Sequence, residues 1–322
     1  MKKRPLGKTN LMVSEIGVGA WQLGGPLLLD GIVDGHPELG REYCVKLIRD
    51  AGQLGVNFID TAEQYGNGES ERRVGEALEG RREEWVIGTK FGAQVGPKGE
   101  RVNDATPARV PVSLENSLRR LRTDHIDIYL YHCAPKPGEA ESVAEFLTQA
   151  RQQGKIRAAG ISTNDLSQVE YLHSLGCLDV VQYAKNMMEP NRKLSEWVAS
   201  HGAGGVVRGA FAGGRLSGRY FRQPPKFGAD DIRSRWTGEK AGQEFARYAA
   251  FEELLSSGRG MIQLALRFLL DEPGTSTIIP GGKSLHDYQE AIRAAELPPL
   301  TEAEKQRIAT LRDEIRSAAA VA

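Results

Sequence analysis

The chain has 322 residues, 40% of them hydrophobic, which is enough to fill one barrel-type core or two ordinary domains. Because 42 basic residues balance 42 acidic ones, no net charge attracts a nucleic acid or an anionic membrane surface, and we expect a small-molecule partner. Three scattered cysteines without a CxxC pair argue against a disulfide framework and structural zinc, and they favour a cytoplasmic location.

Short apolar runs rich in Val, Ile and Phe recur along the chain, each followed by a glycine or polar loop and then by a stretch of helical period. Eight such strand–helix units predict an α/β fold, a (β/α)8 TIM barrel that occupies residues 1–322 as a single domain. The predicted strands are residues 16–21, 57–62, 85–90, 126–132, 156–162, 179–184, 204–210 and 276–281.

The two ends of the chain lie outside this repeat. Residues 2–7 and 12–17 predict an N-terminal β-hairpin that closes the bottom of the barrel. Residues 301–317 predict a C-terminal extra helix, opened by Thr301 with Glu304 at capping-box spacing.

Two predicted loops are much longer than the others. They cover residues 91–107, after the third strand, and residues 212–243, after the seventh. Loops of this length in a compact barrel are usually functional or mobile, so we expect both to border the site.

No segment predicts export or a membrane span. The basic amino terminus lacks the apolar run of a signal peptide. The most apolar helical stretch, residues 261–270, is about ten residues long and contains Arg267, whereas a span needs about 20 apolar residues.

Polar residues stand at the ends of three predicted strands, where a barrel has its active site. Asp60 ends the second strand, Lys90 the third and His132 the fourth, and Tyr65 lies in the loop after Asp60. Because successive strands are neighbours in a barrel, these side chains can converge. Taken singly, each has an ordinary structural explanation, such as a helix cap or a packing contact. Together they are harder to explain that way, because a buried ammonium is costly unless a carboxylate pairs with it.

These four side chains suit acid–base chemistry on a carbonyl or an alcohol. A phenol has a pKa of about 10 and is a poor acid or base near neutrality unless a cation such as Lys90 stabilises its phenolate. Asp60 would keep Lys90 charged and in place, and His132 could donate a hydrogen bond to the substrate oxygen. Two glycines close to Tyr65 would let its loop turn back over the barrel mouth.

Seven motifs follow one another from about residue 4 to about residue 295: RPLGKTNLMVSEIGVGAW, NFIDTAEQYGNGESE, VIGTKFG, IDIYLYH, IRAAGIS, VVQY and IIPGGKS. In this order they resemble the signatures of the aldo-keto reductases. The resemblance implies a catalytic tetrad of Asp60, Tyr65, Lys90 and His132, an NADPH cofactor, and reversible hydride transfer to aldehydes or ketones.

The sequence has no ordinary phosphate-binding motif. No G-x-G-x-x-G follows a predicted strand, and residues 281–284, GGKS, lack the leading glycine of a P-loop because position 277 is threonine. The resemblance implies instead that this loop meets the adenosine phosphate. Lys283 and the backbone N–H groups of Gly281 and Gly282 are then the expected partners of a 2′-phosphate.

The resemblance also assigns the nicotinamide end of the cofactor. It implies that Ser162 and Gln182 hold the nicotinamide amide, and that Gly19, Ala20 and Trp21 line the nicotinamide and substrate end. The segment 208–218 would cradle the pyrophosphate. The other cofactor contacts implied are Asp60, Arg208, Gly209, Phe211 and Gly213.

Four positions depart from the family pattern. Thr163 stands where asparagine is common, so either Thr163 or Asn164 is the second contact of the amide. Arg208 replaces an aromatic residue that usually stacks beneath the nicotinamide, and a guanidinium plane can also stack. Asp287 replaces a residue that is commonly arginine or glutamine. Ala291 replaces a residue that is commonly asparagine. These two changes weaken the case for NADP(H) and leave NAD(H) open.

Our leading expectation is an NADP(H)-dependent oxidoreductase acting on a small aldehyde, ketone, sugar lactol or alcohol. Alternatives are a cofactor-sensing regulatory protein of the same fold, like potassium-channel β-subunits, and a sugar dehydrogenase working mainly in the oxidative direction. A glycosidase would need a second acidic strand end opposite Asp60, and none is as well placed. The sequence does not determine the substrate, the direction of the reaction or the oligomeric state.

Overall fold

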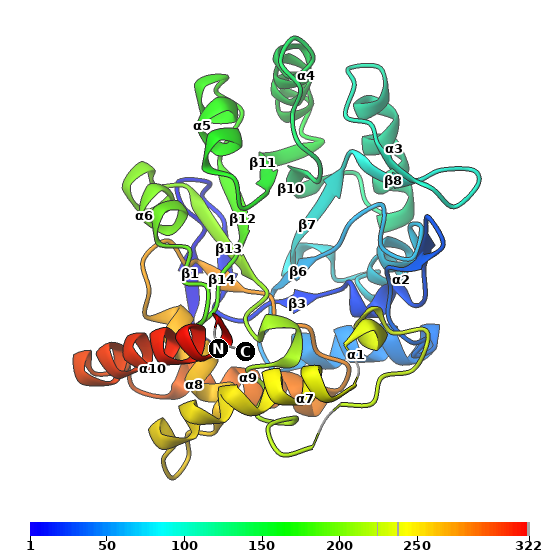
Figure 1. Ribbon diagram of the computed structural model, residues 1–322. Coiled ribbons are helices and arrows are strands. Elements are labelled where there is room, and N and C mark those ends of the chain that lie inside the picture. Colours follow the sequence, from blue (N-terminus) through cyan, green and yellow to red (C-terminus); the bar gives the residue numbers. More distant parts are fainter. Residues whose placement is uncertain (224, 237, 321–322) are drawn as a thin grey trace.

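The computed structural model describes residues 1–223, 225–236 and 238–320. Its centre is an eight-stranded parallel sheet that curls on itself, with helices on the outside (Figure 1). In pairing order the strands are β14 (Thr277–Ile278), β13 (Gly204–Arg208), β12 (Val180–Ala184), β11 (Ile156–Ser162), β10 (Ile126–Tyr131), β7 (Val86–Phe91), β6 (Phe58–Asp60) and β3 (Val18–Gly19).

Backbone contacts link the two edge strands of this sheet. A parallel bridge joins Ile16, just before β3, to Ile278 in β14. Gly17 N donates to Ile278 O at 2.8 Å, and Ile278 N donates to Glu15 O at 3.0 Å. The arrangement is therefore TIM-barrel-like, and each predicted strand is present, although β3 and β14 are only two residues long.

Strand residues alternate between the inside of the sheet and the helical layer. Ile128 and Leu130 of β10 pack in an inner cluster with residues of the other strands, whereas Tyr129 and Tyr131 pack outward with the helices. The neighbouring Lys90 pairs in register with Leu130. This register points the Lys90 side chain into the interior of the curled sheet, where it faces the ends of the other strands.

The predicted N-terminal hairpin is confirmed. β1 (Lys3–Pro5) pairs antiparallel with β2 (Met12–Ser14), and Leu6, Leu11 and Val13 are buried in the inner cluster of the strands. The hairpin therefore fills one end of the curled sheet and leaves the other end for a site.

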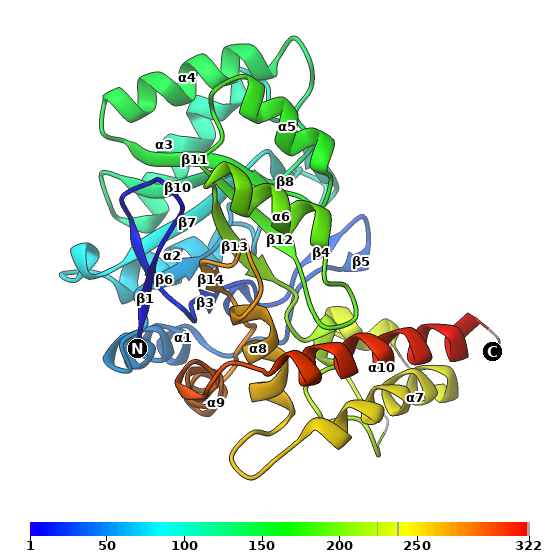
Figure 2. The same cartoon turned by 90° about the vertical axis from the view of Figure 1, so that its left-hand side faces the viewer.

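Helices follow most of the strands, and α8, α9 and α10 gather at one side of the sheet (Figures 1 and 2). The predicted C-terminal helix is α10: Glu304 N donates to Thr301 Oγ1 at 3.2 Å and Thr301 N donates to Glu304 Oε2 at 2.7 Å. No helix of the described residues is long and apolar enough to cross a membrane. The α-helices are α1 (Arg41–Gln53), α2 (Glu69–Ala77), α3 (Arg109–Leu121), α4 (Ala140–Gln152), α5 (Leu166–Ser174), α6 (Arg192–His201), α7 (Gly238–Arg247), α8 (Met261–Leu270), α9 (Leu285–Glu296) and α10 (Glu302–Ala320).

The two long loops contain secondary structure that the sequence reading missed. The loop 91–107 folds into a hairpin of β8 (Ala93–Val95) and β9 (Arg101–Asn103). The loop 212–243 contains the 3-10 helices η3 (Ala212–Gly214) and η4 (Ile232–Arg235) and the start of α7; its residues 224 and 237 lie outside the described residues.

A third insertion follows β3. β4 (Leu28–Leu29) and β5 (Ile32–Val33) form a short hairpin that was not predicted. Asp30 and Gly31 turn it with φ of 54° and 75°. An Asp-Gly pair between apolar residues is a known hairpin signal, so this element was detectable.

We expect Leu6→Ala to lower the free energy of unfolding by about 2–5 kcal/mol, because it opens a cavity where the hairpin closes the sheet. Leu6 is fully buried, whereas Met12 in the same hairpin is 49% exposed. Met12→Ala is therefore the matched control and should change stability by less than about 0.5 kcal/mol. Urea unfolding of both variants measures the difference, and equal effects would contradict the role of the hairpin as a plug.

Candidate active site

The four side chains of the predicted tetrad meet at the carboxyl ends of neighbouring strands. Lys90 Nζ donates to Asp60 Oδ2 at 2.7 Å and to Tyr65 Oη at 3.2 Å. It also donates to Thr61 O at 2.7 Å. These three contacts satisfy the three N–H donors of a fully buried ammonium.

The charge of Lys90 depends on this pairing. Burial by itself lowers the pKa of the ammonium, but Asp60 and Tyr65 outweigh burial and leave the pKa of Lys90 above its usual value. The side chain of Asp60 is only 3% exposed, so neither charge has bulk water as an alternative partner.

The pKa of Tyr65 is not lowered, although the sequence suggested that Lys90 could stabilise its phenolate. Burial raises the pKa of Tyr65 above its usual value, and Lys90 and Arg208 oppose this shift without reversing it. The phenol is therefore protonated at neutral pH and is available as a proton donor.

His132 follows β10 and packs edge-on against Tyr65, with ring centroids 5.6 Å apart. Burial, Lys90 and Arg208 hold the pKa of His132 well below its usual value, so the imidazole is neutral. Its Nδ1 is buried and has no hydrogen-bond partner among the described residues. The neutral ring can donate one hydrogen bond to an oxygen near Tyr65.

The loop that carries Tyr65 requires its glycines. Gly66 has a φ of 57° and Gly68 a φ of 84°. A Cβ at Gly66 would lie 2.0 Å from the carbonyl oxygen of Gly24, so a larger residue would separate this loop from the one after β3. The prediction that these glycines turn the loop over the barrel mouth agrees with this geometry.

The residues expected to hold the nicotinamide amide lie next to the tetrad. Gln182 Nε2 donates to Asp60 Oδ1 at 2.6 Å, and Ser162 Oγ donates to Gln182 Oε1 at 2.9 Å. Thr163 Oγ1 instead donates to Gln168 on α5 at 2.9 Å. Asn164 Oδ1 accepts from Ala184 N at 2.8 Å and from Arg208 Nη2 at 3.5 Å. Asn164 is thus the one of the two alternatives that faces Arg208.

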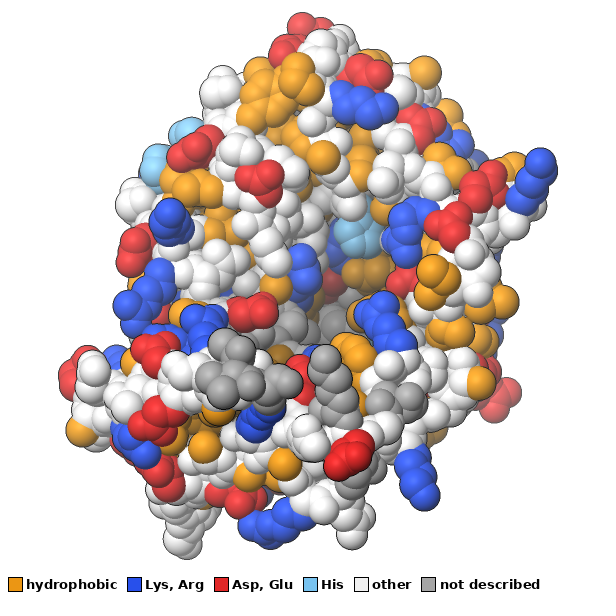
Figure 3. Space-filling model, in the orientation of Figure 1, with side chains coloured by type: hydrophobic (Ala, Val, Ile, Leu, Met, Phe, Trp, Pro, Cys, Tyr) orange, Lys and Arg blue, Asp and Glu red, His pale blue; other side chains and the backbone are white. Residues whose placement is uncertain are grey.

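A cavity of about 540 Å³ opens beside the tetrad, and Figure 3 shows a hollow with Lys and Arg side chains around it. Ala20 is not among its described lining residues; Ala20 N donates to Asp60 O and Ala20 O accepts from Ser70. The predicted residues that line the cavity are Gly19, Trp21, Asp60, Tyr65, Gln182, Arg208, Gly209, Phe211, Gly213, Gly281, Gly282 and Lys283.

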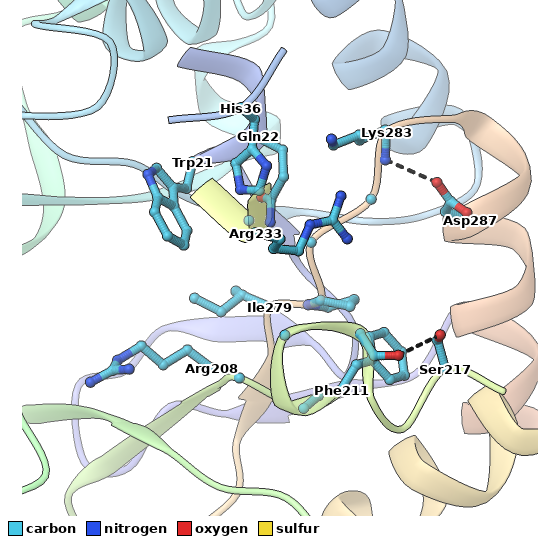
Figure 4. Close-up of a pocket in the computed structure, with 18 of the residues that line it drawn as sticks. Trp21, Gln22, His36, Arg208, Phe211, Ser217, Arg233, Ile279, Lys283 and Asp287 are labelled. Carbon is cyan, nitrogen blue, oxygen red and sulfur yellow. Dashed lines mark hydrogen bonds between the residues drawn. The ribbon is translucent and has the colours of Figure 1, made fainter. Parts of the chain in front are cut away.

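Charged residues cluster at the end of the cavity that Lys283 lines (Figure 4). Lys283 Nζ lies 3.3 Å from Asp231 Oδ2, and Arg233 holds the same carboxylate through two contacts of 2.9 Å and 2.7 Å. Asp287 accepts from Lys283 N at 2.9 Å and pairs with Arg219 at 2.5 Å. The cations outnumber the carboxylates here, because Lys283, Arg219 and Arg233 share two carboxylates.

Sequence reasoning missed several residues of this wall. Arg219, Arg233 and Arg235 come from the long loop 212–243, whose pattern has no strand or helix period to place a side chain. His36 comes from the loop that follows the unpredicted hairpin. For these residues the one sequence signal was the Asp-Gly turn, which indicates the hairpin before His36.

A comparison with known proteins identifies the family. A model of the aldo/keto reductase family matches residues 15–313. The chain belongs to the aldo-keto reductases. Membership in this oxidoreductase family sets aside the glycosidase alternative.

Three relatives show the extent of the likeness. The chain is 29% identical to aldo-keto reductase YhdN of Bacillus subtilis, over 88% of this chain and 85% of that one. It is 34% identical to an NADH-specific methylglyoxal reductase of Escherichia coli, over 59% of this chain and 60% of that one. The solved holo form of aldo-keto reductase AKR11C1 from Bacillus halodurans matches with a TM-score of 0.80 and 28% identity, covering 97% of this chain and 96% of that one.

We expect Lys90→Met to lower the free energy of unfolding by about 3–5 kcal/mol, because it leaves the buried Asp60 carboxylate without its partner. The loss should be larger at alkaline than at acidic pH, since burial raises the pKa of Asp60 and protonation removes the stranded charge.

The double variant Asp60→Asn with Lys90→Met removes both charges and is the matched control. It should recover part of the lost stability in thermal and urea unfolding. If Lys90→Met alone unfolds like the wild type at every pH, the buried pair does not carry the charge balance described above.

Proposed function

We propose that this aldo-keto reductase is an NADP(H)-dependent enzyme that interconverts a small aldehyde, ketone or sugar lactol with the corresponding alcohol. The observation that carries the proposal is the contact of the Lys90 ammonium with both Asp60 and the Tyr65 hydroxyl at the wall of the cavity. A phenol held by a buried ammonium beside a neutral imidazole suits protonation of a carbonyl oxygen.

The size and charge of the cavity support a dinucleotide as its ligand. Its volume of about 540 Å³ falls within the usual range for ligand sites, and its cationic end suits phosphate groups. When bound, the nicotinamide supplies or accepts the hydride. Gln182, which lines the cavity, would hold its amide together with Ser162 and Asn164.

The protein side chains handle the proton. In reduction Tyr65 gives its hydroxyl proton to the carbonyl oxygen, and in oxidation it takes the proton from the alcohol. Lys90 stabilises the phenolate that forms, while Asp60 keeps Lys90 charged. His132 donates a hydrogen bond to the same oxygen. Because the pKa of Tyr65 is raised, the hydroxyl is protonated near neutrality and is ready to donate in the reductive direction.

The charges at the far end of the cavity support NADP(H) over NAD(H). Among the described residues Lys283 Nζ pairs with Asp231 alone, at 3.3 Å, and it can turn toward a 2′-phosphate. Asp287 is engaged by Arg219 and caps the first turn of α9, so it is not offered to a ribose hydroxyl as acidic residues are in NAD sites. The NADH-specific relative makes the choice of cofactor an experimental question.

Tyr65→Phe should lower turnover by about 10²–10⁴-fold while leaving dinucleotide affinity close to that of the wild type, because it removes the acidic proton and keeps the ring. Steady-state rates with a panel of aldehydes, ketones and sugars, together with cofactor titrations, measure both quantities. Undiminished turnover would remove Tyr65 from its role.

Lys283→Ala should weaken NADP(H) binding by about tenfold to a hundredfold and leave NAD(H) binding nearly unchanged, because one charge-assisted contact to the 2′-phosphate is lost. Lys46→Ala, an exposed lysine on α1, is the control. Fluorescence titration with NADPH and NADH decides the point. Equal affinities in the wild type, or equal losses in the variant, would overturn the assignment of Lys283.

A further inference from the structure

His36 is a buried histidine on the cavity wall. Its relative exposure is 4%, and both ring nitrogens are buried without a hydrogen-bond partner among the described residues. The ring packs edge-on against Trp21, with centroids 5.0 Å apart, and borders the same cavity as the tetrad. Buried polar groups without a partner are rare and costly, so this ring calls for a partner that enters from the cavity.

The nearest carboxylate does not supply that partner. His36 Nδ1 lies 3.7 Å from Asp231, beyond hydrogen-bond length. Both oxygens of Asp231 already accept from Arg233, and Lys283 lies 3.3 Å from one of them. The segment that carries Asp231 is tied to the His36 loop, because Ile232 N donates to Gly35 O at 2.9 Å.

The charged groups that face His36 make its surroundings cationic. Burial and then Lys283 lower the pKa of His36 to about 4, Asp231 opposes this, and Arg233 lowers the pKa further. The partner that suits such a site is an anion, because an anion would be stabilised by the Arg233 guanidinium and by a ring N–H.

The position of His36 indicates which anion. Figure 4 shows His36 and Arg233 between Trp21, at the tetrad end of the cavity, and Lys283, at the other end. Trp21 is next to Tyr65, with ring centroids 6.1 Å apart. A dinucleotide that reacts at Tyr65 and places its adenosine phosphate at Lys283 has its diphosphate between these ends.

We propose, on the basis of the function above, that His36 is a binding residue for the diphosphate of the dinucleotide and acts together with Arg233. Bound diphosphate then favours the imidazolium form of His36. Binding takes up a proton, so affinity increases as pH falls from about 8 to about 5.5. The steepest pH dependence that the uptake of one proton allows is a tenfold fall in Kd for each unit by which the pH is lowered.

Isothermal titration calorimetry of NAD⁺ between about pH 5.5 and pH 8 tests this inference. NAD⁺ is the probe because the 2′-phosphate of NADP⁺ has its own pKa near 6 and would add a second slope. The wild type should show a Kd that falls toward acidic pH and proton uptake in buffers of different ionisation enthalpy. His36→Asn, which keeps an N–H donor but does not titrate, should lose both.

His125→Asn is the matched control, because His125 lies at the opposite ends of the strands, just before β10, and should leave both signals unchanged. A melting curve confirms that each variant is folded. NADP⁺ titrations of the same proteins repeat the comparison, since its phosphate contributes equally to wild type and variant. Equal pH slopes in the wild type and His36→Asn would overturn the role of His36 alone, whereas failure of both dinucleotides to bind would overturn the proposed function with it.

Discussion

The buried ammonium of Lys90 is the constraint on which the rest of the site depends. A fully buried lysine stays charged only if its donors are met by charged or strongly polar acceptors. Here Asp60, Thr61 O and Tyr65 Oη meet all three donors, and each comes from β6 or from its loop. The pairing of β6 with β7 is therefore what brings Lys90 to Asp60 and Tyr65, and a shift of one residue in register would point Lys90 into the helical layer.

The two ends of the cavity use charge in opposite ways. At the tetrad the positive charge of Lys90 is matched by the carboxylate of Asp60. At the far end the cations outnumber the carboxylates, and this excess of positive charge suits an anionic ligand; the cations are Arg219, Arg233 and Lys283, and the carboxylates are Asp231 and Asp287. In the function we propose, charge balance at one end supports proton transfer, and the excess of positive charge at the other end supports cofactor binding.

The insertions shape the cavity as much as the strands do. The hairpin after β3 leads to His36, and the loop after β13 supplies Arg233 and Trp236. Ile232 N and Gly35 O join these two segments, although they are far apart in the chain. The sheet thus positions the side chains of the tetrad, while loops from two different strand ends surround the cavity beside them.

The sequence by itself determined the parallel sheet, the closing hairpin, the capped α10 and the approach of Asp60, Lys90 and His132. These features depend on local periodicity, on caps a few residues long and on the adjacency of successive strands, all of which are visible in a linear pattern. Tertiary structure alone decided the direction of the pKa shift at Tyr65 and the meeting of His36, Asp231 and Lys283. The first depends on how much water packing removes from the phenol, and the second on contacts between loops without a period, neither of which has a local signal.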